Sequence, residues 1–172
     1  MSNMTVAMSD GFLEAFSALP RQRQGRVREF LNKFRENPRS PGINYEKIHS
    51  AFDPNIYSVR IDDTYRGIVM RTAQADAYFL LWVDHHDRAY EWASRKRCQV
   101  NPTTGTIQLF EVQEGAIEVE ETAPPADSLF ARVTDDQLLR LGVPKEKLAE
   151  TRQMTTMADL YERQSSYPED AW

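Results

Sequence analysis

The sequence is poor in cysteine and has no long apolar run. Cys98 is the single cysteine among the 172 residues, so the chain cannot form an internal disulfide, which fits a reducing cytoplasm. No apolar run approaches the roughly 20 residues that a membrane-spanning helix needs. Residues 1–10 lack the basic start and the apolar stretch of a signal peptide. We therefore expect a cytoplasmic protein without a membrane partner.

Histidine is also scarce, and this limits the metal sites that the chain can build. His49, His85 and His86 are the three histidines, and without a cluster of thiolates they do not match a structural zinc site. HD-type metal phosphohydrolases need His and Asp ligands on several helices, which this sequence does not offer. The chain also has neither a Gly-rich phosphate-binding loop nor a Gly-x-Ser-x-Gly motif. We expect no metal and no other cofactor.

Charge is divided unevenly along the chain. Residues 1–106 carry 15 Lys and Arg against 12 Asp and Glu, a balance of +3. Residues 107–172 carry 6 against 14, a balance of −8. Such a shift predicts two modules with different partners, of which the first can bind an anionic ligand and the second repels one.

The period of the apolar residues changes near residue 45. Before that point, helical spacing predicts helices over residues 10–19 and 21–37. After it, alternation predicts a hairpin of two strands across Asp62-Asp63-Thr64, and a nearly all-apolar run predicts a buried third strand. These three strands are expected at residues 56–61, 65–72 and 77–83. The expected core is made of Phe16, Val27, Phe30, Phe34, Val59, Ile68 and Leu80.

The patterns together predict an α+β fold in which two N-terminal helices pack on a small twisted antiparallel sheet, followed by a short hairpin and a small helical extension. The expected parts are a main domain at 1–106, an acidic hairpin at 107–122 that pairs 106–112 with 116–120, a linker at 123–126 and a helical extension at 127–172. Thr134-Asp135-Asp136-Gln137 has the pattern of a helix capping box, and Gly142 predicts a helix end. The ending at Trp172 predicts a truncated extension.

Ionisable side chains gather where the buried strand ends and a helix is expected to begin. We expect this helix to run from Asp87, its N-cap, to Arg97. His86 and Tyr90 are four residues apart and share a face in such a helix. Because histidine exchanges protons near neutral pH, this segment predicts acid–base work on a phosphodiester. The alternative interpretation is a capped helix start with Tyr90 packed on the core.

Two arginines flank the hairpin turn and are candidates for binding phosphate. Arg60 and Arg66 lie just inside the tight turn, so they can face one another across the two strands. Two guanidinium groups on one face of a sheet can donate paired hydrogen bonds to phosphate oxygens. The alternative is a pair of surface arginines neutralised by Asp62 and Asp63, and the spacing favours neither interpretation.

The combination of helices, strand hairpin, buried strand and His86-Asp87-x-x-Tyr90 resembles the RelE/ParE toxin superfamily over roughly residues 10–97. The resemblance implies helices packed on a small twisted antiparallel sheet. It also implies one of two activities, because the ribonuclease members cut messenger RNA on the ribosome and the ParE branch poisons gyrase.

Carried over residue by residue, the resemblance implies four catalytic candidates, Arg60, Arg66, His86 and Tyr90. The nucleic-acid-binding candidates are Lys47, Arg60, Arg66 and Arg88. The ribonuclease members are strongly basic, whereas this domain is only mildly so and offers Lys47 without a lysine cluster. We therefore expect nucleic-acid binding with weak or no cleavage.

A more particular pattern, at residues 85–93 and 129–144, resembles the N-terminal region of bacterial proteins related to UvrD/Rep helicases. The resemblance implies an accessory module directed at nucleic acid or the ribosome. It implies partners among RNA, DNA and the ribosome, and a C-terminal motor in a parent protein that is an ATP-dependent DNA helicase. Two alternatives stay open, an active metal-independent RNA endonuclease and a catalytically inert protein–protein docking domain.

Overall fold

The structure, a computed structural model, describes residues 4–72, 77–112, 123–168 and 171. The chain forms two compact units, unit 1 at residues 1–94 and unit 2 at residues 95–172. The sequence predicted a first boundary after residue 106. The separate linker and extension predicted within the second half stay predictions.

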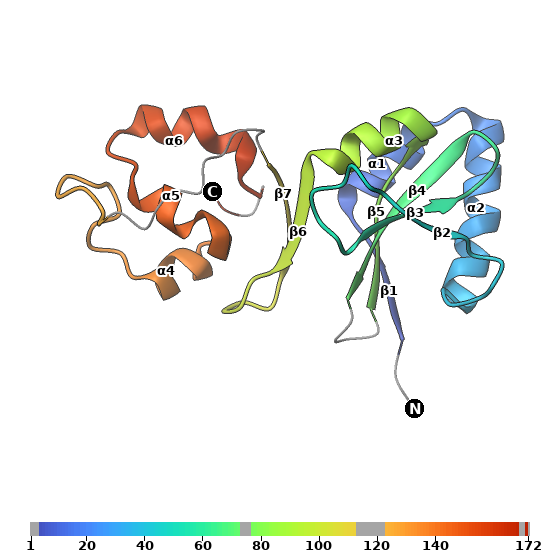
Figure 1. The fold of residues 1–172 in the computed structure, drawn as a ribbon, viewed down its shortest axis with the longest axis horizontal. Helices are drawn as coiled ribbons and strands as arrows, with labels where there is room; N and C mark the ends of the chain where they lie inside the picture. The colour runs from blue at the N-terminus through green and yellow to red at the C-terminus, as the bar shows by residue number, and fades with distance from the viewer. Residues whose placement is uncertain (1–3, 73–76, 113–122, 169–170, 172) are drawn as a thin grey trace. The chain divides into compact units, whose positions relative to one another are not determined.

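Unit 1 is a mixed sheet covered by helices (Figure 1). Its elements are β1 (Thr5–Met8), α1 (Asp10–Ala18), α2 (Arg21–Glu36), β2 (Tyr45–Lys47), β3 (Ile56–Arg60), β4 (Tyr65–Thr72), β5 (Ala77–His85) and α3 (His86–Ser94). The five strands run in the order β1-β5-β4-β3-β2. The α+β class is confirmed, and so is the hairpin of β3 and β4.

The sequence predicted an antiparallel sheet, but the observed sheet also contains one parallel pair of strands. β1 pairs in parallel with β5, with Thr5 opposite Ala77 and Met8 opposite Leu80. The sequence analysis missed β1 because a strand of four residues is too short to show a clear alternation. The predicted turn at 74–76 lies outside the described residues.

The helix α1 is capped by the residue directly before it. The Ser9 side chain accepts a hydrogen bond from the Phe12 backbone N–H at 3.1 Å, so Ser9 is the N-cap. Asp10 lies in the first turn, where its negative charge interacts favourably with the positive end of the helix dipole. Leu19 and Pro20 then separate α1 from α2.

The main core lies between α1, α2 and one face of the sheet. Val27 and Phe34 are fully buried there against Val59, Tyr78 and Leu80. Gly67 is opposite Val59 in β4, where an added Cβ would lie 3.0 Å from Val59 Cγ2, so a larger residue would press into this core. Most of the expected core is confirmed; Phe16 is only partly buried, and Ile68 lies outside this cluster.

The helix α3 contacts β4 and β5 on the opposite face of the sheet. Side chains alternate along a strand, so Ser58 and Ile68 point away from the face that holds Val59 and Val69. Ala89 and Ala93 of α3 are fully buried, which lets the helix approach the sheet closely. Both faces of the central strands are therefore covered.

The helix α3 ends at Ser94, three residues before the predicted end, and Asp87 lies in its first turn and not at the N-cap. The next residues form β6 (Lys96–Val100), which pairs antiparallel with β7 (Ile107–Glu111). The sequence had paired 106–112 with 116–120, which lie outside the described residues. The pairing of 106–112 with 116–120 therefore stays a prediction, whereas Lys96 and Arg97 lie in β6 and not in the predicted helix.

Unit 2 packs the ribbon of β6 and β7 with short helices. These are α4 (Asp135–Arg140), η1 (Lys145–Lys147), α5 (Leu148–Arg152), α6 (Met157–Arg163) and η2 (Gln164–Ser166). The buried Asn101 side chain donates to the Leu139 carbonyl at 2.8 Å, and the buried Gln108 side chain donates to the Gly142 carbonyl. These buried amides tie the ribbon to the end of α4.

Local patterns predicted part of this unit correctly. The capping box of Thr134 and Gln137 is present at the start of α4. Gly142 follows the helix with a φ of 93°, a left-handed conformation that favours glycine at a helix end. In the described part of the chain, no helix combines the length and apolar character needed to cross a membrane.

The hairpin turn between β3 and β4 is organised by Asp62. Its carboxylate accepts hydrogen bonds from the backbone N–H groups of Thr64 and Tyr65, each at 2.8 Å, and from Arg23 Nη1 at 2.9 Å. Burial by itself would raise the pKa of Asp62, but these hydrogen bonds outweigh burial and hold the pKa below its ordinary value of 3.8. The turn is therefore held by an ionised carboxylate.

Truncation of Phe34 tests the position of the main core. Phe34→Ala should lower the free energy of unfolding by about 3–5 kcal/mol, because it removes a fully buried ring. Phe52→Ala is the matched control, since Phe52 is 52% exposed; it should change the free energy by about 0.5 kcal/mol. Urea unfolding measures both, and equal losses would place the core elsewhere.

Removal of the Asp62 charge tests the turn. A carboxyl whose pKa is depressed by folding contributes stability above its unfolded pKa, and this contribution is lost as the pH falls through the folded pKa. Asp62→Asn should therefore be roughly 1–2 kcal/mol less stable near pH 7, with a smaller deficit below about pH 4. Asp63→Asn, whose carboxylate is 93% exposed, is the control. A deficit that does not depend on pH would contradict the assignment.

Candidate functional site

Polar side chains from β2, β3, β4 and α3 meet on the face of the sheet that α3 covers. Glu46 lies opposite Ser58 in the pairing of β2 with β3, and Ser58 lies opposite Ile68 in β4. Because side chains alternate, Arg66 in β4 shares the face of Ile68. We call Glu46, Ser58, Arg66, His86 and Tyr90 the α3-face cluster.

Tyr90 is at the centre of the α3-face cluster. Its hydroxyl donates to Glu46 Oε2 at 3.1 Å and lies 2.9 Å from the Ser58 hydroxyl. Its ring lies 4.2 Å from the His86 ring, measured between centroids, as expected for residues one helical turn apart. Tyr90 therefore joins a carboxylate on β2 to an imidazole on α3.

Arg66 presents a fixed guanidinium beside the same carboxylate. Its side chain is only 10% exposed, and its Nη1 donates to the backbone carbonyls of Asp62 at 2.9 Å and Tyr65 at 3.1 Å. Its Nε lies 4.0 Å from Glu46 Oε2, beyond hydrogen-bond distance. Within the described residues, this buried Nε has no hydrogen-bond partner. An oriented donor without an acceptor costs free energy, which a bound anion would recover.

His86 is oriented at the start of α3. Its backbone N–H donates to the Thr64 carbonyl at 2.8 Å, and its Nδ1 lies 3.0 Å from Asp87 Oδ1. The hydrogen bond from His86 lowers the pKa of Asp87, so that carboxylate stays ionised and can only accept. The proton of this bond therefore belongs to Nδ1, and Nε2 is the ring nitrogen that can exchange a proton with a substrate.

The structure brings together three of the four catalytic candidates. Arg66, His86 and Tyr90 belong to the α3-face cluster. Arg60 is the cross-strand partner of Arg66, but its side chain pairs with Asp63, which is the surface arrangement considered as the alternative. Arg66 instead contacts the backbone carbonyl of Asp62. The roles of these residues stay predictions.

The remaining nucleic-acid-binding candidates lie apart from the cluster. Lys47 follows Glu46 in β2, so alternation turns it toward the other face of the sheet. Arg88 lines a separate hollow of about 480 Å³ together with Glu14 and Asp84. Lys47 and Arg88 therefore do not belong to the α3-face cluster, and their role in binding nucleic acid stays a prediction.

The sequence analysis missed Glu46 and Ser58. Both are ordinary polar residues in short strands, and β2 has only three residues, so its alternation could not be read. Their place in the cluster comes from the pairing of β2 with β3 and from the packing of α3. Across the described ranges, no group of three or more His, Cys, Asp or Glu side chains is placed to hold a metal ion.

Comparison with known proteins finds similar structures but no family. No family model matches the sequence, and no curated protein matches it. One similar solved structure is a RelE–RelB complex from Pyrococcus horikoshii OT3, with 22% identity, coverage of 52% of this chain and 100% of that one, and a TM-score of 0.39. A second is a RelB–RelE antitoxin–toxin complex from Methanococcus jannaschii, with 15% identity, coverage of 50% of this chain and 96% of that one, and a TM-score of 0.41. A third is the isolated E. coli RelE toxin, with 14% identity, coverage of 48% of this chain and 83% of that one, and a TM-score of 0.36. Each is similar to about half of this chain.

Proposed function

We propose that unit 1 acts on single-stranded RNA and that the α3-face cluster cleaves a phosphodiester without a protein-bound cofactor. The observation that carries the proposal is the junction of Glu46, Tyr90 and Arg66. It places an ionisable carboxylate beside a buried guanidinium whose Nε has no acceptor among the described residues. A carboxylate and a cationic donor at one point can take a proton and hold a phosphate.

The chemistry assigns one role to each side chain. Arg66 Nε donates to a non-bridging phosphate oxygen and stabilises the charge that develops there. Glu46 takes the proton of the ribose 2′-hydroxyl, whose oxygen then bonds to phosphorus. The bond from phosphorus to the 5′ oxygen breaks, and protonated His86 Nε2 gives its proton to that oxygen. The products are a 2′,3′-cyclic phosphate and a 5′-hydroxyl.

Tyr90 and Asp87 position the reacting groups. The Tyr90 hydroxyl fixes the Glu46 carboxylate, and the Tyr90 ring supports the imidazole of His86. Asp87 holds His86 Nδ1, which directs Nε2 outward. The carboxylate of Glu46 is about half exposed, so a substrate can reach it.

Net charge does not explain RNA binding by this unit. Residues 1–94 contain 12 Lys and Arg and 12 Asp and Glu, so attraction must come from the local arrangement of cations. We therefore expect weak binding that falls as salt rises. The accessory role beside a UvrD/Rep-type motor stays a prediction from the resemblance in sequence.

Substitutions in the cluster test cleavage. Wild-type protein should cut an unstructured RNA, free or on a translating ribosome, and Glu46→Gln and His86→Ala should each slow the cut by about 10²–10⁴-fold, because each removes one proton-transfer group. His49→Ala, which changes an exposed histidine outside the cluster, is the matched control. Gel electrophoresis and mass spectrometry identify the product ends.

The same experiment can refute the proposal. Circular dichroism and thermal unfolding should show that all variants are folded. Cleavage by Glu46→Gln at the wild-type rate would remove Glu46 as the base. Bound but uncut RNA on both substrates, with wild-type protein, would refute the nuclease assignment.

A further inference from the structure

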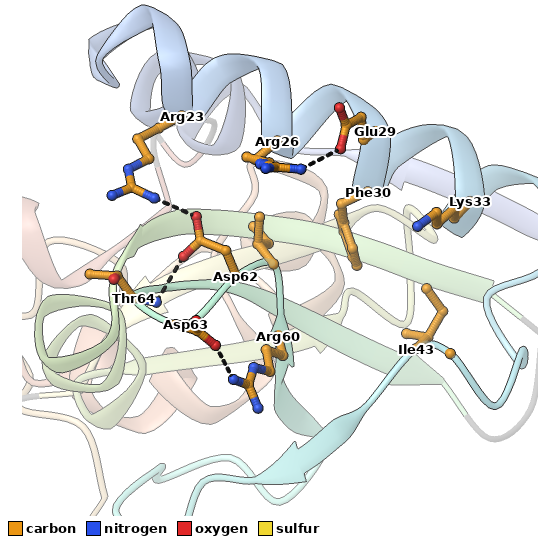
Figure 2. Close-up of a pocket in the computed structure, with 12 residues that line it drawn as sticks. Arg23, Arg26, Glu29, Phe30, Lys33, Ile43, Arg60, Asp62, Asp63 and Thr64 are labelled. Atoms are coloured by element: carbon orange, nitrogen blue, oxygen red, sulfur yellow. Dashed lines mark hydrogen bonds and ion pairs between the residues drawn. The ribbon is translucent and has the colours of Figure 1, made fainter.

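A second group of cations lies on the other side of the hairpin turn. Figure 2 shows a hollow between α2 and this turn, with a volume of about 500 Å³. Arg23, Arg26 and Lys33 reach it from α2. Arg60 lines its edge at the end of β3, with its guanidinium turned toward Asp63. We call this site the α2 hollow. Its volume lies within the range of small-molecule pockets.

One of these cations, Arg23, is held in place by contacts within the fold. Arg23 Nη1 donates to Asp62 Oδ2 at 2.9 Å, and its guanidinium lies 5.2 Å from the centre of the Tyr65 ring. Asp62 is itself fixed by the turn. Arg23 and Asp62 therefore form a neutral wall of the α2 hollow.

The other three cations are open to exchange. Arg26 pairs with Glu29 at 3.2 Å, but the two side chains are 63% and 64% exposed. Arg60 pairs with Asp63, whose carboxylate is almost fully exposed. Lys33 also lines the hollow, from the turn of α2 that follows Glu29. Exposed ion pairs contribute little, so Glu29 and Asp63 can turn into solvent when a stronger anion arrives.

We propose that the α2 hollow binds a backbone phosphate of the RNA strand that occupies the α3-face cluster. This inference rests on the proposed function for its occupant. Arg60 and Arg66 are directly opposite one another in the β3–β4 pair, where Cα atoms lie about 4.5–5.5 Å apart. Arg66 serves the cluster and Arg60 lines the hollow, so a strand that passes the turn meets both sites.

This continuity favours RNA over an acidic peptide. Carboxylates and phosphates would bind the same cations, and Glu29, Asp62 and Asp63 would repel both. A strand of RNA, however, carries an anion at every nucleotide, so it can place one phosphate at Arg66 and another in the hollow. The guanidinium of Arg60 also offers two parallel donors to phosphate oxygens.

Paired substitutions within α2 test the proposal. Arg26→Gln with Lys33→Gln removes two cations from the hollow, and Arg21→Gln with Arg35→Gln removes two cations from the same helix outside it. All proteins carry Glu46→Gln so that RNA stays intact. Fluorescence anisotropy measures the affinity for an unstructured RNA of roughly a dozen nucleotides at several salt concentrations.

The hollow pair should weaken binding about fivefold or more, and the slope of log affinity against log salt should become shallower by about 0.7–1.4, as expected for one or two lost contacts. The control pair should change affinity by about twofold or less. Equal losses in both pairs, unchanged affinity in the hollow pair, or no RNA binding at all would overturn the proposal. If only the hollow pair loses affinity, and the wild-type protein does not cut RNA, this inference is upheld and the nuclease assignment is refuted.

Discussion

The anchoring of the Arg66 guanidinium is the interaction on which the proposed site depends. A guanidinium is always charged, and this one is almost fully buried, so its hydrogen bonds must replace the water that it loses. The backbone carbonyls of Asp62 and Tyr65 satisfy one end of the group. The Nε has no hydrogen-bond acceptor among the described residues, and Glu46 Oε2 lies 4.0 Å from it. Under the proposed function, a phosphate oxygen would supply this missing acceptor.

Patterns with a short range in sequence predicted much of the fold. Alternation on either side of Asp62 gave the hairpin, because a period of two needs only a few residues to be seen. The apolar stripe of α2 gave Val27 and Phe34 as core residues. The capping box of Thr134 and Gln137 located a helix start in unit 2 from four residues.

Features that arise from distant pairing could not be predicted in this way. β1 became a strand through β5, and β6 through β7, although neither has a clear strand pattern of its own. The same holds for the site: Glu46 enters it through the register of β2 with β3. Arg60, in contrast, was placed beside Arg66 by spacing, but its side chain turned to Asp63 because that carboxylate is only three residues away.

The central claim is that Arg66 binds the phosphate at which RNA is cut. A crystal structure of the protein with an RNA whose 2′-hydroxyls are methylated tests this most directly, since such an RNA can bind but cannot react. The predicted result is a phosphate oxygen within hydrogen-bond distance of Arg66 Nε, with the adjacent 2′ oxygen beside Glu46. An RNA bound elsewhere, with Glu46 still facing Arg66, would contradict the claim.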